Sequence, residues 1–109
     1  MARYFKDAFV VAGGAVAHTF GPVTSETRLR DLLVHANTAP TTVGDFTLPL
    51  DSVNGSEHDL KLYALNLAAA ATTDVFNTDL DLLLLPGDAL KVAYANADGR
   101  TLGVQLIFE

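Results

Sequence analysis

The chain of 109 residues contains no cysteine. It therefore has no disulfide framework, no thiolate zinc site and no cysteine nucleophile. Long apolar runs are also missing, since the longest strongly apolar run, Leu82 to Leu85, is far shorter than the roughly 20 residues of a membrane-spanning helix. The first residues, Met1 to Asp7, lack the apolar core and the cleavage site of a signal peptide. We expect neither a membrane protein nor a secreted one.

Positive charge is scarce. Seven lysines and arginines stand against 13 aspartates and glutamates, which gives a formal net charge of -6 at pH 7. An acidic chain repels phosphate backbones, so we expect no nucleic-acid partner. Several of the few basic residues, among them Arg3, Lys6, Arg28 and Arg30, fall in the first thirty positions. This asymmetry either orients the domain against a neighbour or reflects a mixed surface.

Hydrophobic residues are abundant: they make up 50% of the chain, whereas charged residues make up 18%. This composition excludes intrinsic disorder, and the length predicts one domain over residues 1–109. A domain of this size buries only about 60–70% of the surface of its unfolded chain. We therefore expect apolar area to stay exposed and to contact a partner, which indicates assembly with other subunits.

The C-terminal part has the clearest strand pattern. From Thr101 to Glu109 apolar and polar side chains alternate, as in a strand with one solvated face, and Leu90 to Tyr94 alternates in the same way. Asp98-Gly99 lies between these two segments and offers the positive φ of a tight turn. The pattern predicts a β-hairpin.

Three further segments indicate strands. Around Phe46 to Leu50 the alternation includes Pro49, which cannot donate a ladder hydrogen bond and so predicts an edge strand or a bulge. A second hairpin is predicted on either side of the Gly13-Gly14 turn. The segment from Arg28 to Ala36 has apolar residues on both faces, which predicts a central strand covered on both sides.

The middle of the chain adds two strands. Leu60 to Leu67 is favoured as a strand, Ala68 to Ala71 is interpreted as a connection because four residues are too few for a stable helix, and Asp79 to Leu85 enters a strand that breaks at Pro86-Gly87-Asp88. With about eight short strands, the fold class we predict is all-β: a single-domain antiparallel β-sandwich, jelly-roll-like, with residues 1–9 as a candidate N-terminal arm.

No residues converge on chemistry in the sequence. The histidines His18, His35 and His58 lack the short spacing of a metal site, and no serine lies in a nucleophile elbow. Asp79 and Asp81 are interpreted as a solvated strand face, and Asn96 to Gly99 as a turn rather than a calcium loop. We therefore expect no enzyme, no metal and no cofactor.

Several short motifs resemble small proteins encoded by tailed bacteriophages, over roughly Arg28 to Phe108. The motifs are Ala39-Pro40-Thr41-Thr42, Leu50-Asp51-Ser52-x-x-Gly55, Leu62-Tyr63-x-Leu65-x-Leu67, Thr73-Asp74, Leu85-Pro86-Gly87-Asp88-Ala89 and Ala93-Tyr94-Ala95-Asn96-x-Asp98-Gly99-Arg100-Thr101-x-Gly103. The resemblance implies a single β-sandwich or jelly-roll domain of the virion, without catalytic residues. Because these are turn motifs, they specify a fold more strongly than a function.

Together these observations favour a structural virion protein. We expect a capsid decoration, or cement, protein that binds the major capsid protein on the capsid surface as a small homo-oligomer, such as a trimer. It would stabilise the head shell after synthesis in the host cytoplasm. The alternative is an adaptor of the tail, neck or fibre, or a jelly-roll protein that binds a receptor glycan. The expected contact residues lie in the N-terminal arm and at an exposed sheet edge: Arg3, Tyr4, Phe5, Lys6 and Pro49.

Overall fold

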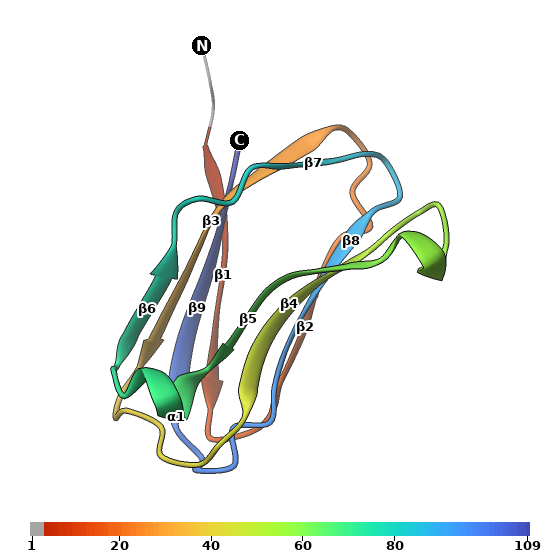
Figure 1. Cartoon of the computed structure of the whole chain (residues 1–109). Helices are drawn as coiled ribbons and strands as arrows, with labels where there is room; N and C mark the ends of the chain where they lie inside the picture. Colours follow the sequence, from red (N-terminus) through yellow and green to blue (C-terminus); the bar gives the residue numbers. More distant parts are fainter. Residues whose placement is uncertain (1–3) are drawn as a thin grey trace.

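The computed structural model describes residues 4–109, which form two antiparallel sheets packed face to face (Figure 1). Sheet A has the strand order β1-β9-β3-β6, and the short β7 also pairs with β3; sheet B has the order β2-β8-β4-β5. The strands are β1 (Phe5–Ala12), β2 (Val16–Phe20), β3 (Thr27–Ala36), β4 (Asp45–Asp51), β5 (Leu60–Asn66), β6 (Asp74–Asn77), β7 (Leu82–Leu84), β8 (Ala89–Tyr94) and β9 (Thr101–Phe108).

The strand order is that of a jelly roll. Apart from the three-residue β7, each strand pairs with its counterpart from the other half of the chain: β1 with β9, β2 with β8, β3 with β6 and β4 with β5. The chain is thus one long antiparallel hairpin that is folded over into two layers. The prediction of an all-β jelly-roll sandwich is confirmed, with nine strands in the described part of the chain rather than about eight.

The core lies between the two sheets and consists of the inward side chains of both. Strand β9 contributes four fully buried residues, Leu102, Val104, Leu106 and Phe108, in the predicted alternation. Phe108 stacks on Phe20 of the opposite sheet, with a distance of 4.1 Å between ring centroids. Because β9 pairs with β1 on one side and β3 on the other, it is an interior strand of sheet A.

Both predicted hairpins are wrong. The turn at Asn96 to Gly99 forms as expected, with a φ of 66° at Gly99, but β8 belongs to sheet B and β9 to sheet A. The Gly13-Gly14 turn likewise joins β1 of sheet A to β2 of sheet B. In both cases the apolar faces of the two strands face each other across the core, so the turn reverses the chain without joining its strands in one ladder.

Two other differences come from β-bulges. In β3 the register with β9 shifts between Leu29 and Asp31, so that Leu29, Leu32 and Val34 all point into the core and β3 has one buried face instead of two. In β4 the shift lies between Leu48 and Pro49. This bulge accommodates Pro49 in a strand that pairs on both sides, with β5 and β8, so the alternative of an edge strand is wrong.

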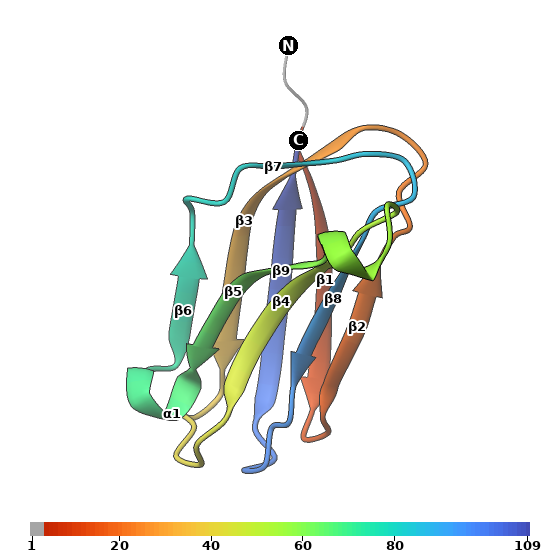
Figure 2. The ribbon, with the colours of Figure 1, turned by 45° about the vertical axis from the view of Figure 1, so that its right-hand side comes forward.

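Two short helical segments lie at opposite ends of the sandwich (Figure 2). One is α1 (Leu67–Ala70), which connects β5 to β6, where we had predicted a connection without a helix. The side chain of Asn66 caps it by accepting the N–H of Ala68, and buried Leu67 attaches it to the core. The other is η1 (Ser56–His58), a 3-10 turn between β4 and β5.

Asp88 joins the loops at the end of the sandwich near η1. Its carboxylate, on a residue only 7% exposed, accepts the backbone N–H of Val53 at 2.9 Å and that of Leu85 at 3.0 Å. Its backbone carbonyl accepts the N–H of Val23 at 2.9 Å. One residue therefore holds three segments that are distant in sequence.

Asp98 has the same role at the opposite end. Its carboxylate accepts the backbone N–H groups of Thr41 and Thr42, both at 2.8 Å, and the Thr42 hydroxyl. The hydrogen bonds from the Thr42 side chain and backbone, followed by that from Thr41, lower the pKa of Asp98 from 3.8 to about 2. The ionised form of Asp98 thus fixes the loop between β3 and β4.

Candidate functional site

The outward-facing side of sheet A is the strongest candidate for a functional surface. We call it the outer face; it is built from alternate residues of four strands, and the pairing registers place them in rows across the sheet. One row is Val10, Gly103, His35 and Asp74, and the next is Ala8, Gln105, Leu33 and Phe76. Each row therefore joins β1, β9, β3 and β6.

This outer face is unusually apolar for a solvated surface. Val10 is 72% exposed at one side of the sheet, and Phe76 is 67% exposed at the other. Half-buried Leu33 and exposed Ala8 lie in the row that ends at Phe76. Apolar side chains gathered on one exposed face indicate a contact surface more strongly than the same residues scattered singly.

A hollow of about 570 Å³ lies in the outer face. Gly103 lies in its lining with no side chain, and a Cβ atom built there would meet no atom within 4 Å. Ala8, Val10 and His35 also line the hollow, and a smaller hollow of about 200 Å³ continues towards Phe76. The size falls within the range of ligand pockets, but this hollow is open to solvent, which suits a protruding side chain of a partner.

His35 and Asp74 form a hydrogen-bonded polar pair in the lining of these hollows. The imidazole Nδ1 of His35 contacts the Asp74 carboxylate, and the two side chains are 68% and 66% exposed. An exposed polar pair of this kind contributes little to folding stability. The residues that line the two hollows include no hydroxyl or thiol, so this pair has no adjacent nucleophile to activate.

The predicted contact residues do not gather in one place. Tyr4 is 64% exposed, Phe5 stacks on Phe108 at 5.1 Å, and Lys6 donates a hydrogen bond to Gln105 at 3.1 Å on the outer face. Phe5 onward belongs to β1, so the expected arm does not extend through residues 5–9. Arg3 lies outside the described residues.

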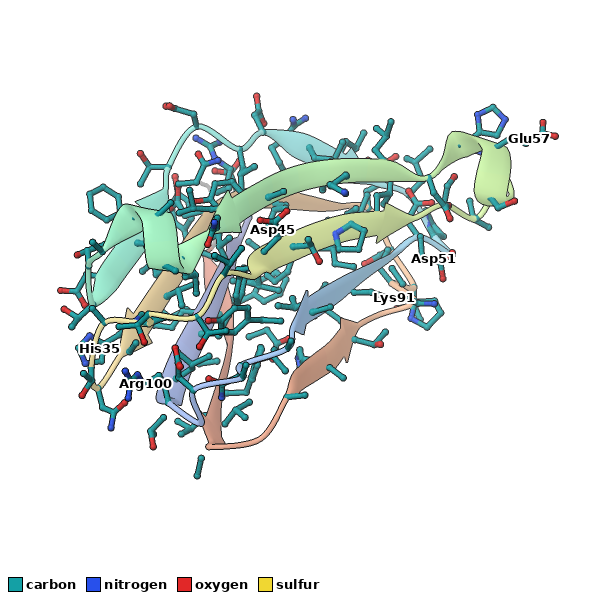
Figure 3. All side chains as sticks on the ribbon, turned by 60° about the horizontal axis from the view of Figure 1, so that its bottom comes forward. His35, Asp45, Asp51, Glu57, Lys91 and Arg100 are labelled. Atoms are coloured by element: carbon teal, nitrogen blue, oxygen red, sulfur yellow. The ribbon has the colours of Figure 1, made fainter. Side chains whose placement is uncertain are left out.

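Pro49 lies in sheet B, away from β1. It lines a separate hollow of about 290 Å³ together with Lys61 and the ion pair between Lys91 and Asp51, whose Nζ and Oδ2 atoms are 3.2 Å apart. Figure 3 shows Lys91 and Asp51 close together at the opposite end of the molecule from His35 and Arg100. With β4 inside the sheet, the exposed edge that we predicted at Pro49 is not there.

The remaining candidates for chemistry are dispersed. His18 Nε2 contacts the Asp7 carboxylate at 2.7 Å, whereas His58 lies in exposed η1. Asp81 pairs with Arg28 at 2.7 Å. Within residues 4–109, no three histidine, aspartate or glutamate side chains are grouped so that they could hold a metal ion.

Comparison with known proteins gives no match: neither a protein-family model nor a curated protein sequence is similar to the chain. In the described part of the chain, no helix is long and apolar enough to cross a membrane. Neither result assigns a family.

Proposed function

We propose that the chain is a structural protein of a tailed-phage virion, which decorates the assembled head shell and stabilises it. The observation that carries this proposal is the apolar outer face of sheet A, where Val10 and Phe76 are largely exposed around an open hollow. A rigid sheet with exposed apolar residues and a polar side-chain pair suits attachment to another protein. The turn motifs that resemble small phage proteins supply the virion context.

Stabilisation follows from mass action. A protein that binds the assembled shell but not its separate subunits lowers the free energy of the assembled state, and the effect grows with its free concentration. The apolar residues of the outer face supply the contact area. The pair of His35 and Asp74 adds polar recognition at the hollow.

The decisive measurement is the copy number of the chain in purified virions, determined by mass spectrometry calibrated against the major capsid protein. A copy number comparable to that of the shell protein supports decoration. A small fraction of it assigns the chain to the tail, neck or fibres instead, where adaptor or glycan-binding roles apply. Absence from virions refutes a virion role.

Two variants test the surface itself. Gly103→Val places a side chain in the hollow, where nothing lies within 4 Å of the Cβ position, and Phe76→Ser removes the exposed ring at the β6 side. Both variants should bind isolated shells at least about tenfold more weakly, by the loss of a central contact. Ala93→Val adds two methyl groups to the exposed side of sheet B and serves as the control for a larger apolar side chain elsewhere on the surface. Unchanged binding by Gly103→Val and Phe76→Ser would exclude the outer face.

A further inference from the structure

Strand β1 is the longest and most regular edge of the sandwich. Its eight residues pair with β9 without a register shift, and no described strand pairs with its other side. The remaining edges are less suitable for pairing: β6 has four residues, β2 has five, and the pairing of β5 contains the bulge at Pro49. An unbroken edge of this length offers a template for another strand.

The hydrogen bonds of β9 show which groups of β1 are free. The backbone carbonyl of Thr101 accepts the N–H of Asn37, and Glu109 exchanges two bonds with Arg28, so the odd-numbered residues of β9 bond towards β3. Directions alternate along a strand, so the even-numbered residues of β9 bond to β1. Four residues of β1 therefore point their N–H and C=O groups to the free edge: Lys6, Ala8, Val10 and Ala12.

The charged side chains of β1 do not protect this edge against pairing with another strand. Natural edge strands are commonly protected by lysine, proline or a bulge. Here Lys6 turns its ammonium group over its own sheet to Gln105, at 3.1 Å, and Asp7 turns its carboxylate inward to His18, at 2.7 Å. Val10, 72% exposed, remains at the edge without protection.

We propose that two copies of the chain pair through β1, antiparallel and about a two-fold axis at Ala8. Pairing of β1 with a second β1 brings identical sets of free donors and acceptors together in a closed arrangement. With Ala8 opposite Ala8 of the second copy, Lys6 lies opposite Val10, and no like charges meet. This register overlaps Tyr4 to Ala12, whereas a shift of the axis to Phe9 runs into the Gly13-Gly14 turn.

The dimer joins the two five-stranded sheets into one continuous sheet. Each exposed Val10 then lies beside Lys6 of the other copy, on the same face of the joined sheet. The larger hollow of one copy, which Ala8 and Val10 line, then adjoins the same hollow of the other copy across the axis. The inference does not depend on the virion role, because it concerns the purified chain alone.

Sedimentation equilibrium of the full chain tests the proposal, and a dimer is expected. Val10→Lys places a lysine opposite Lys6 twice in each dimer, and the dissociation constant should rise about tenfold or more. The double variant Val10→Lys with Lys6→Glu restores opposite charges and should recover the dimer. Ala17→Lys adds the same charge to β2, an edge strand of sheet B, at an exposed position opposite Ala93, and should leave the dimer intact.

A cysteine cross-link tests the register, because the chain has no cysteine of its own. Oxidised Ala8→Cys should form a covalent dimer, since opposite Cα atoms at such a position lie about 5.5 Å apart. Ala17→Cys, on exposed Ala17 of β2, should not form a covalent dimer.

A monomer at all concentrations, or a dimer unaffected by Val10→Lys, would overturn the proposal. If the monomer binds shells and Val10→Lys abolishes that binding, β1 accepts a strand of the shell protein instead of a second copy.

Discussion

Asp88→Ala should remove the side-chain connection between the loop after β4 and the turn before β8, at one end of the sandwich, and should leave the backbone hydrogen bond to Val23 in place. The carboxylate accepts two backbone N–H groups, from Val53 and Leu85, and the residue is 7% exposed. A hydrogen bond to a charged acceptor contributes about 1.5–3 kcal/mol. Because the two N–H groups lie in surface loops that water can reach once the carboxylate is gone, the lower figure applies to each. The free energy of unfolding should therefore fall by about 3 kcal/mol.

Thermal unfolding followed by circular dichroism measures this effect. With an unfolding entropy of about 2.1 cal/mol/K per residue, a loss of about 3 kcal/mol in a chain of this length lowers Tm by roughly 13 °C. Asp88→Asn keeps one acceptor oxygen and should lower Tm by about half as much. Asp79→Ala, which removes an exposed carboxylate, is the control and should change stability by less than about 0.5 kcal/mol. If Asp88→Ala and Asp79→Ala unfold at the same temperature, the carboxylate does not hold the loops.

Three further changes test other parts of the fold. Gly99→Val should cost roughly 1–2 kcal/mol, because Gly99 has a φ of 66° and a β-branched residue is strained there; an unchanged Tm would contradict this reason. Asp98→Asn should be less stable than the natural chain at neutral pH, and the difference should vanish as pH falls through the folded pKa of about 2, since a lowered pKa stabilises only the ionised form; a difference that persists at lower pH would argue against it. Phe108→Ala should cost about 3–5 kcal/mol in urea unfolding, because its ring is fully buried against Phe20 and Phe5, and a loss below about 1 kcal/mol would show that the core closes over the gap.

The sequence located most strands but not their partners. Alternation from Thr101 to Phe108 predicts both the strand and its buried face, and both are confirmed. It cannot predict the sheet to which a strand belongs, because the inner faces of both sheets are equally apolar. For that reason two turns that join different sheets were predicted as hairpins. In β3 one bulged residue near Arg30 shifted the alternation and suggested two buried faces.

The outer face was beyond sequence reasoning for a similar reason. Val10 and Phe76 are far apart in the chain, and only the registers of β1, β9, β3 and β6 bring them onto one face. A weak signal was present: Val10 and Leu33 are apolar at positions where the alternation of their strands calls for polar residues, and Gly103 interrupts β9 with no side chain. Of the residues predicted for contact, Lys6 lies on this face, where it bonds to Gln105.

The jelly-roll order also determines when this protein can fold. Phe5, at the start of β1, pairs with Phe108, at the end of β9. Strand β1 therefore cannot form its hydrogen bonds within sheet A until β9 is present. Closing such distant contacts costs chain entropy before any of them stabilises the fold, and folding is correspondingly slow. Until β9 has left the ribosome, sheet A lacks an interior strand, and β1 and β3 both stay without the neighbour that separates them. The sandwich therefore cannot close before β9 has been synthesised, and until then the exposed strands depend on chaperones or on their own solubility.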